Sequence, residues 1–318
     1  MTKIQLYAGG KRERVSKEQA TQLVQRWTRE LEAADGVFRV DLSCRSWALE
    51  AFDVIQPFLA NVAKDVKYAV FADIIAGLMT DEGLAVTEAL AKTFAAAPLV
   101  DIELSDNAMG PRGLIRLESM IVDAPLQRLY LGNCGLSYES MKLLKEWLTA
   151  DNNRIAGQMR ELLLDRNMTG PEGAKEVGEI LANCKKLEYF SHLGCRTREG
   201  TIHLAVGLQK MVEGCDRPAL CRLDIDDCTF GEEECAALAG ALSACSNMRH
   251  LELPDAGCGV DGLKKIVDAL TSAGAKMTHL GLGTCIIVHC HSHSLSDRAL
   301  IITFLNISLI LFCYRWLR

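Results

Sequence analysis

Aromatic residues, proline and basic charge are all scarce in this chain of 318 residues. Phe, Trp and Tyr together make up 6% of the residues, and proline occurs only 7 times. The 35 Lys and Arg residues are outnumbered by 41 Asp and Glu residues, which gives a formal net charge of −6. A hydrophobic core must therefore be built from Leu, Ala and Val rather than from rings. The acidic balance argues against nucleic-acid binding, which needs a basic face, and suits a protein partner with a basic surface.

Common catalytic motifs are also missing. The chain contains no G-x-x-x-x-G-K-[ST], no G-x-S-x-G and no H-E-x-x-H. His192 and Cys195 lie close in sequence, but Cys195 occupies a structural position of the repeat described below, so we expect no catalytic dyad. We therefore expect a protein that is not itself an enzyme, with no cofactor, no bound metal and no small-molecule substrate.

A secretory signal is not evident either. Residues 1–16 have no apolar core followed by a small-residue cleavage site. The 13 cysteines are odd in number and lack paired spacing. This pattern indicates reduced thiols in a cytosolic protein.

What the chain does have is one unit that recurs along it. Copies of a pattern close to L-x-x-L-x-L-x-x-[N/C] begin at residues 99, 126, 159, 187, 220, 248 and 277, and weaker copies begin at 37 and 66. A helical stretch follows each strand, for example over 173–184 and 234–245. This pattern is typical of the long leucine-rich repeat. It predicts an α/β solenoid shaped as a horseshoe, with parallel strands on the concave face and helices on the convex face.

The repeat also suggests three regions. Residues 1–36 are expected to form an N-terminal cap, with a strand over 4–8 and a helix over 16–31 that has Ser16 as its N-cap. Residues 37–285 are expected to form an array of about eight units. Residues 286–318 do not continue the repeat and form an atypical hydrophobic tail.

Three interpretations of the tail stay open: a truncated or misread end of the coding sequence, a hydrophobic capping element, or a membrane anchor. Residues 299–314 are mostly apolar, but they are shorter than the roughly 20 residues that a membrane-spanning helix needs, and Asn306 interrupts them. The histidines and cysteine at 289, 290, 291 and 293 are too tightly spaced for a tetrahedral metal site without further ligands.

Within each unit, the Asn or Cys that closes the pattern is expected to turn inward and bond backbone groups where the strand ends. This position, called the inward slot below, is filled by Asn107, Cys134, Asn167, Cys195, Cys228 and Cys285. Cys184 and Cys245 are expected to fill the core. Because Cys134 fills the slot of its own unit, the preceding Asn133 is expected to lie on the rim of the array with its amide free.

Partner binding on such a scaffold is expected at the exposed strand positions and at the strand ends. The exposed strand positions are Asp101, Glu103, Arg128, Tyr130, Glu161, Asp224, Asp226, His250 and Glu252. From the strands and strand ends together, the partner-binding candidates are Glu103, Tyr130, Asp224, Asp106, Asn107, Asp165 and Arg166. Tyr130 is a possible anchor. The alternative is that these side chains only keep the concave surface soluble.

Several segments resemble the Ran GTPase-activating proteins, which are leucine-rich-repeat activators of the small GTPase Ran. The similar segments are FADIIAG with DE, LSDNAMGPRG, LQRLYLGNCGLS, RSWALEA and the stretch 167–190, and the last two look most like the plant-type branch. The resemblance spans roughly residues 1–285. Gly77 is followed by Leu78, where the family usually has an arginine. The acidic C-terminal segment and the plant N-terminal targeting domain of the family are not found.

The resemblance implies a GTPase activator whose partner is a Ran-type GTPase in its GTP-bound form. Asn133 matches the asparagine of the family's L-Y-L-x-N-x-G motif, which is understood to help position the GTPase's own catalytic glutamine. That glutamine orients the attacking water, and no arginine finger is supplied. The resemblance also implies a cytoplasmic location, possibly at the nuclear envelope, with membrane contact only if the tail is genuine. The alternative is a protein-interaction scaffold of the ribonuclease-inhibitor type.

Overall fold

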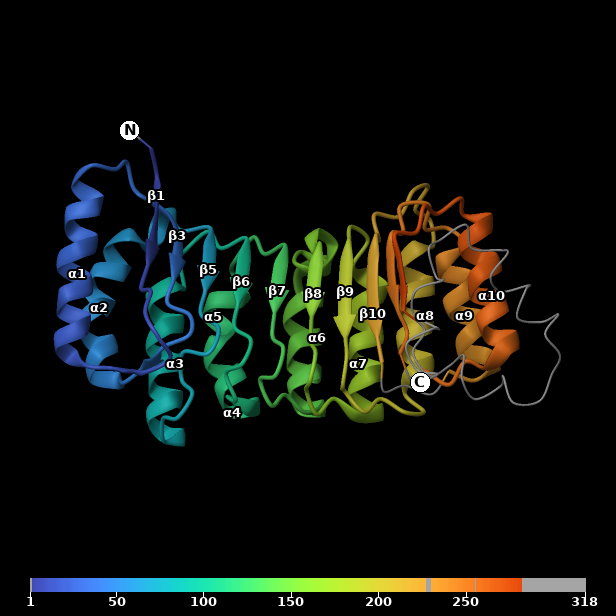
Figure 1. Cartoon of the computed structure of the whole chain (residues 1–318), viewed down its shortest axis with the longest axis horizontal. Coiled ribbons are helices and arrows are strands. Elements are labelled where there is room, and N and C mark those ends of the chain that lie inside the picture. The colour runs from blue at the N-terminus through green and yellow to red at the C-terminus, as the bar shows by residue number, and fades with distance from the viewer. Residues whose placement is uncertain (1, 227–229, 255, 282–318) are drawn as a thin grey trace, which may run out of the picture.

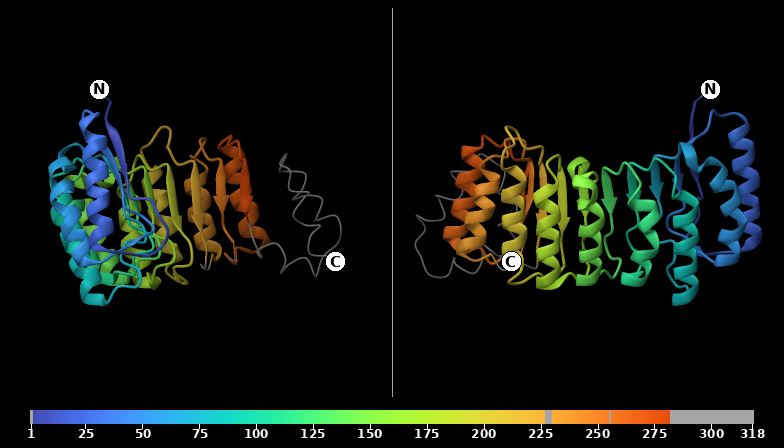
Figure 2. Two further views of the ribbon diagram at one scale, coloured as in Figure 1. Left: turned by 60° about the vertical axis from the view of Figure 1, so that its left-hand side comes forward. Right: turned by 180° about the vertical axis from the view of Figure 1, so that it is seen from behind.

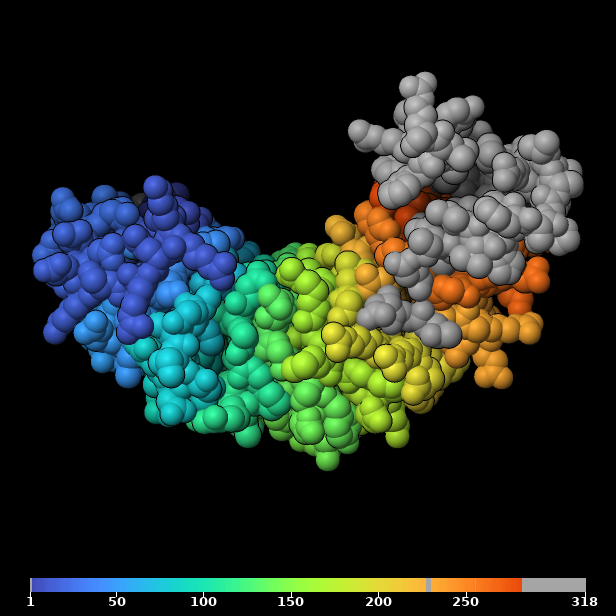
Figure 3. Space-filling view, turned by 60° about the horizontal axis from the view of Figure 1, so that its bottom comes forward, coloured from blue at the N-terminus to red at the C-terminus, as the bar shows by residue number. Residues whose placement is uncertain are grey.

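Parallel strands form one long sheet along the concave side of the molecule (Figures 1 and 3). The computed structural model describes residues 2–226, 230–254 and 256–281. Within these residues the sheet has ten strands, in the order of the chain. The strands are β1 (Ile4–Tyr7), β3 (Val37–Asp41), β5 (Tyr68–Val70), β6 (Asp101–Glu103), β7 (Arg128–Tyr130), β8 (Glu161–Leu163), β9 (Tyr189–His192), β10 (Arg222–Ile225), β11 (His250–Glu252) and β12 (His279–Gly281).

The helices cover the opposite side of the sheet, as the view from behind shows (Figure 2). They are α1 (Lys17–Glu32), α2 (Leu49–Val62), α3 (Thr80–Phe94), α4 (Gly110–Leu114), α5 (Glu118–Ile121), α6 (Tyr138–Asn153), α7 (Gly170–Asn183), α8 (Thr201–Val212), α9 (Glu232–Leu242) and α10 (Gly259–Ser272). Short 3-10 turns η1 (Ala63–Asp65), η2 (Ile115–Leu117) and η3 (Ala156–Gln158) join some of them. The fold is a leucine-rich-repeat solenoid, as the repeat pattern predicts.

The N-terminal cap continues the sheet rather than standing apart from it. Strand β1 pairs in parallel with β3, and a small second sheet of β2 (Arg14–Val15) and β4 (Ser46–Trp47) ties the following loop to the first repeat. Ser16 caps α1 with a capping box, since its side chain accepts from the Gln19 backbone N–H and the Gln19 side chain accepts from the Ser16 N–H. The predicted strand and the Ser16 N-cap are therefore both present.

Strands β5, β6, β7, β8 and β11 bury their middle residue and turn their partly exposed flanking residues to the concave face. The middle positions of neighbouring strands are in register, so their side chains stack into one continuous core. These stacked core residues are Ile102, Leu129, Leu162, Phe190, Leu223 and Leu251, all fully buried. The flanking positions form two parallel rows on the concave face. One row consists of the residues before the buried middle positions, and the other consists of the residues after them.

The inward slot works as predicted where the structure describes it. The Asn107 side chain accepts hydrogen bonds from the Ile74 and Ile75 backbone N–H groups and donates to the Phe71 and Leu104 carbonyls. Asn167 repeats this arrangement between its own unit and the preceding one. A cysteine in the inward slot makes fewer hydrogen bonds than an asparagine. The thiol of Cys134 donates to the Leu104 carbonyl at 3.2 Å. Cys228 and Cys285 lie outside the described residues.

Helices α7 and α8 approach each other unusually closely on the convex side. A Cβ added at Gly178 would collide with the backbone carbonyl of His203, and one added at Gly207 would collide with the Gly178 backbone. The two glycines therefore allow direct contact between helix backbones. Just beyond the C-terminal ends of α7 and α9, burial raises the pKa of Cys184 and of Cys245 to about 12, so both thiols stay protonated at neutral pH.

The C-terminal tail over 286–318 lies outside the described residues, so its three interpretations stay open. Across the part of the chain that is described, no helix has both the length and the apolar composition needed to cross a membrane.

Candidate functional site: the rim at the ends of β6, β7 and β8

In consecutive units of the described part of the array, the residue just before the inward slot has a left-handed backbone conformation. The φ angle is +56° at Asp73, +63° at Asp106, +53° at Asn133 and +54° at Arg166. In the next unit the same position is Gly194, with φ of +66°. Asn, Asp and Gly tolerate this conformation best, which explains why they recur here. We call this column of residues the rim.

The rim backbone is fixed by the neighbouring unit. The N–H of Asp106 donates to the Gly132 carbonyl at 2.8 Å, and the N–H of Asn133 donates to the Asp165 carbonyl at 2.7 Å. The N–H of Arg166 donates to the Leu193 carbonyl at 2.6 Å. Because the backbones of Asp106, Asn133 and Arg166 are held while their side chains are exposed, this part of the rim presents side chains to solvent from a rigid base.

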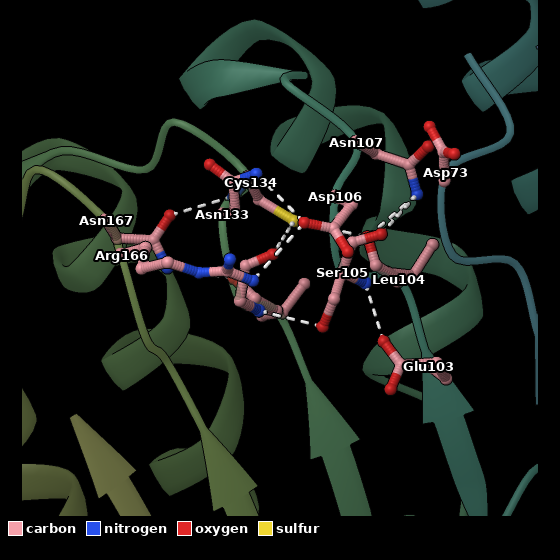
Figure 4. Close-up of polar contacts among 12 residues, drawn as sticks. Asp73, Glu103, Leu104, Ser105, Asp106, Asn107, Asn133, Cys134, Arg166 and Asn167 are labelled. Carbon is pink, nitrogen blue, oxygen red and sulfur yellow. Dashed lines mark hydrogen bonds and ion pairs between the residues drawn. The ribbon is translucent and has the colours of Figure 1, made fainter. Parts of the chain in front are cut away.

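Two rim side chains converge on one carboxylate oxygen of a third (Figure 4). The Asn133 amide Nδ2 donates to Asp106 Oδ1 at 2.9 Å, and Arg166 Nη2 lies 3.3 Å from the same oxygen. The side chain of Arg166 is 63% exposed and that of Asp106 is 44% exposed, so the group is open to solvent. Asn133, Asp106 and Arg166, called the rim triad below, come from three consecutive units.

The rim triad corrects one expectation for Asn133. Its side chain is exposed on the rim as predicted, but its amide is not free of structural contacts, because one N–H is bonded to Asp106. The backbone of Asn133 also has a left-handed φ, which restricts the residue types that fit this position. The sequence pattern could not show either feature, since both depend on the neighbouring units.

Ser105 was missed by sequence reasoning, and it joins the two family-like motifs. Its hydroxyl accepts a hydrogen bond from the Gly132 N–H at 3.0 Å. Its own backbone N–H donates to the Glu103 carboxylate at 2.7 Å. Its position inside L-S-D-N-A was the available signal, because a serine beside a strand end commonly bonds nearby backbone.

The carboxylate of Asp165 is held by hydrogen bonds to the next unit and is not free. Its Oδ1 accepts from the Ser191 hydroxyl at 2.6 Å and from the Leu193 N–H at 2.8 Å. It thus fixes the loop after β9 in the same way that Glu103 fixes the loop after β6. Both side chains remain partly exposed beside the rim, so they stay candidates for partner binding.

For two residues, Asn107 and Asp224, the predicted role in partner binding is wrong. Asn107 is 1% exposed and its amide is fully used in the inward slot, so it cannot reach a partner. The Asp224 side chain is 2% exposed beneath Arg222, which contacts one of its carboxylate oxygens at 2.7 Å. The strand alternation correctly turned Asp224 toward the concave face, but long neighbouring side chains cover it.

On the concave face beside the rim, charged and aromatic side chains bond to one another across strands. The Tyr130 hydroxyl donates to Glu161 Oε2 at 2.8 Å, and Arg128 Nε donates to Glu161 Oε1 at 2.9 Å. The pKa of Tyr130 lies far above its usual range. Burial of the ring is the largest cause, and the hydrogen bond to Glu161 is the second. Tyr130 is half-buried, so only part of its ring is available to a partner.

Asp101, at the start of β6, gives a pH-dependent prediction. Burial raises its pKa to about 6, against an opposing attraction to Arg128 4.0 Å away. The folded state therefore takes up this proton before the unfolded chain does, and stability rises as pH falls from about 7 towards 4. We expect Asp101→Asn to raise the melting temperature near neutral pH, with a gain that disappears near pH 4. Thermal unfolding across this range tests it. A loss at neutral pH would mean that the attraction to Arg128 outweighs burial.

Similarity to known proteins is distant. No family model matches the chain. It is 24% identical over 212 residues to mouse NACHT, LRR and PYD domains-containing protein 5, which covers 58% of this chain and 18% of that protein. It is 28% identical over 170 residues to Ran GTPase-activating protein 1 of Xenopus laevis, which covers 50% of this chain and 29% of that protein. It is 24% identical over 194 residues to the ribonuclease inhibitor of Sus scrofa, which covers 59% of this chain and 34% of that protein.

All three relatives are leucine-rich-repeat proteins. The chain spans only about a fifth to a third of their lengths. These similarities agree with the observed solenoid.

Proposed function

We propose that this chain activates GTP hydrolysis by a Ran-type small GTPase in its GTP-bound form. Asn133 positions the GTPase's own catalytic glutamine, and the active site of the GTPase carries out the hydrolysis. The similarity to a Ran GTPase-activating protein over half of the chain supports the class of partner. The proposal places this activity in the cytoplasm, as part of nucleocytoplasmic transport.

The observation that carries the proposal is the geometry of the Asn133 amide. One of its N–H groups is fixed by Asp106, which sets the orientation of the amide plane. Within the described residues, the second N–H and the carbonyl oxygen bond no other group and face solvent. A glutamine side chain needs one donor and one acceptor to be oriented, and this amide offers both.

The rim triad also explains why no arginine finger is assigned. Arg166 is the cation nearest to Asn133 on the rim, and its guanidinium is paired with Asp106. We infer that Arg166 helps to hold Asp106, and through it Asn133, and that it contacts the GTPase surface with its remaining donors. Preorganising the amide in this way lowers the reorganisation needed in the transition state.

A single-turnover assay tests the function directly. Ran loaded with GTP is mixed with the full chain, and phosphate release is followed under conditions where each GTPase turns over once. We expect the rate constant to rise by at least about 100-fold, because orienting the attacking water through the glutamine is a large part of GTPase activation. An unchanged rate with saturating chain would refute the proposal.

A second candidate function is a protein-interaction scaffold that changes no active site. It is favoured by the concave face, where Arg128, Tyr130 and Glu161 form a cross-strand cluster suited to a protein surface. Similarity to a ribonuclease inhibitor also supports it. Binding of Ran-GTP without any change in its hydrolysis rate would favour this function over activation.

A further inference from the structure

A cluster of metal-ligating side chains lies at the C-terminal end of the concave face, away from the rim triad. Parallel pairing of β11 and β12 places His250 directly opposite His279. The two imidazole rings stack with centroids 4.1 Å apart and planes inclined by 12°. Glu252 follows two residues after His250 and therefore points to the same face. One ligand atom from each of these three residues lies within 4.8 Å of the other two.

A glycine makes room for this arrangement. Gly281 is the register partner of Glu252, and a Cβ at that position would collide with the Glu252 carboxylate. Glu252 leans over Gly281 towards β12, where its Oε1 contacts His279 Nε2. The carboxylate is thereby drawn between the two strands.

Asp224 places a buried carboxylate directly behind His250. Its Oδ2 is bonded by the Tyr189 hydroxyl at 2.9 Å and by Arg222. Its Oδ1 is buried and has no hydrogen-bond partner, and it lies 3.2 Å from His250 Nε2, which also lacks one. A carboxylate in a side chain that is only 2% exposed needs positive charge near it, and a cation held by His250 would add to the charge that Arg222 supplies.

We propose that His250, Glu252 and His279 bind a divalent transition-metal ion of the Zn²⁺ type, with Asp224 as the supporting carboxylate behind His250. Two imidazole nitrogens and one carboxylate oxygen form a ligand set that zinc uses with its fourth position open. Bonds of about 2.0–2.2 Å need ligand atoms roughly 3.5 Å apart, so side-chain rotations must close the present spacing by about 1 Å. The ion would join β11 to β12 and leave one coordination position facing the concave surface.

The site is hidden in the sequence because its ligands come from two repeats. His250 and His279 are separated by 29 positions, which is the length of one unit, so they share the same repeat position. Sequence reasoning expected no metal because it looked for closely spaced ligands. Comparing equivalent positions in consecutive units would have found the pair, since register stacks them.

Cobalt(II) titration of the full chain, purified in the presence of a chelator and then freed of it, tests the proposal. We expect one equivalent of Co²⁺ to bind with a visible d–d absorption band and without a thiolate-to-cobalt charge-transfer band. Zn²⁺ should displace it. Glu252→Gln and His279→Ala should each weaken binding by at least about 10-fold, because each removes a direct ligand. Both side chains are partly exposed, so these variants are expected to fold.

Two controls separate this site from other metal-binding groups in the chain. His203→Ala removes an exposed imidazole from α8 and should leave Co²⁺ binding unchanged. A chain with His289, His291 and His293 all changed to alanine should also retain the band. Binding that survives His279→Ala, is lost only in the triple variant, or shows the thiolate band would overturn the proposal. An absence of binding at micromolar Co²⁺ would overturn it as well.

Discussion

Changing Asn133 to glycine is expected to reduce stimulation of GTP hydrolysis by about 10²–10³-fold, the usual loss when one positioned hydrogen-bonding group is removed. Glycine is chosen because Asn133 has a φ of +53°, which glycine adopts without strain. Only the amide is lost, along with its bond to Asp106. Binding of Ran-GTP should weaken much less than the rate falls, because the amide acts mainly in the transition state. Single-turnover rates measured over a range of chain concentrations separate the two effects.

Asn133→Ala is the matched control for folding. Alanine lacks the amide but is strained at positive φ, so this variant should lose activity equally and also lose about 1 kcal/mol of stability. Thermal unfolding compares the two variants. Full activity in Asn133→Gly would refute the role assigned to the amide, while leaving the proposed activation of the GTPase standing. A large loss of stability in Asn133→Gly would instead show that the bond to Asp106 holds the rim together.

The largest effect on stability is expected for Asn107→Ala. This substitution leaves the Ile74 and Ile75 N–H groups and the Phe71 carbonyl without their buried partner, while the Leu104 carbonyl keeps only the Cys134 thiol. Each unsatisfied buried group costs about 1–3 kcal/mol, and partial relaxation should reduce the sum to roughly 3–4 kcal/mol. At about 2–4 °C per kcal/mol, the melting temperature should fall by roughly 10 °C. Calorimetry or circular dichroism on heating measures the shift.

Asn107→Cys is the informative companion to this variant, because cysteine fills the same slot at Cys134 and Cys195. In both of those units the thiol donates to one carbonyl at 3.2 Å. We therefore expect Asn107→Cys to recover part of the stability lost in Asn107→Ala. If the cysteine variant were no more stable than the alanine variant, hydrogen bonding in the slot would not explain why Asn and Cys recur there in this chain.

The solenoid was predictable because its signal repeats. The spacing of Leu126, Leu129 and Leu131 indicates a strand with its middle residue buried, and the same pattern in other units makes the assignment stronger than any single copy would. The inward placement of Asn107 and Asn167 follows from the same pattern, since a polar residue beside a buried strand end must satisfy backbone groups. These predictions rest on local sequence, and the structure agrees with them.

The site was less predictable because its contacts join different units. Exposure of Asn133 followed from Cys134 filling the slot, but the bond to Asp106 spans 27 residues. For Asp224, the contacts with other units determine exposure and not hydrogen bonding. Its alternation with buried Leu223 and Ile225 places it on the concave face, yet Arg222 and Tyr189 cover it there. Strand periodicity describes direction, whereas exposure depends on the length of the neighbouring side chains.

The contact between α7 and α8 through Gly178 and Gly207 has a consequence for the curvature of the molecule. Strands in a sheet are spaced about 4.8 Å apart, while packed helices are usually about 8–10 Å apart, and this difference bends the array at each unit. Where two helix backbones touch, the outer arc is shorter, so the bend between those two units is smaller. We therefore expect the arch to bend less between these two units than between its other units, so that Gly178 and Gly207 set the local radius that a convex partner must match.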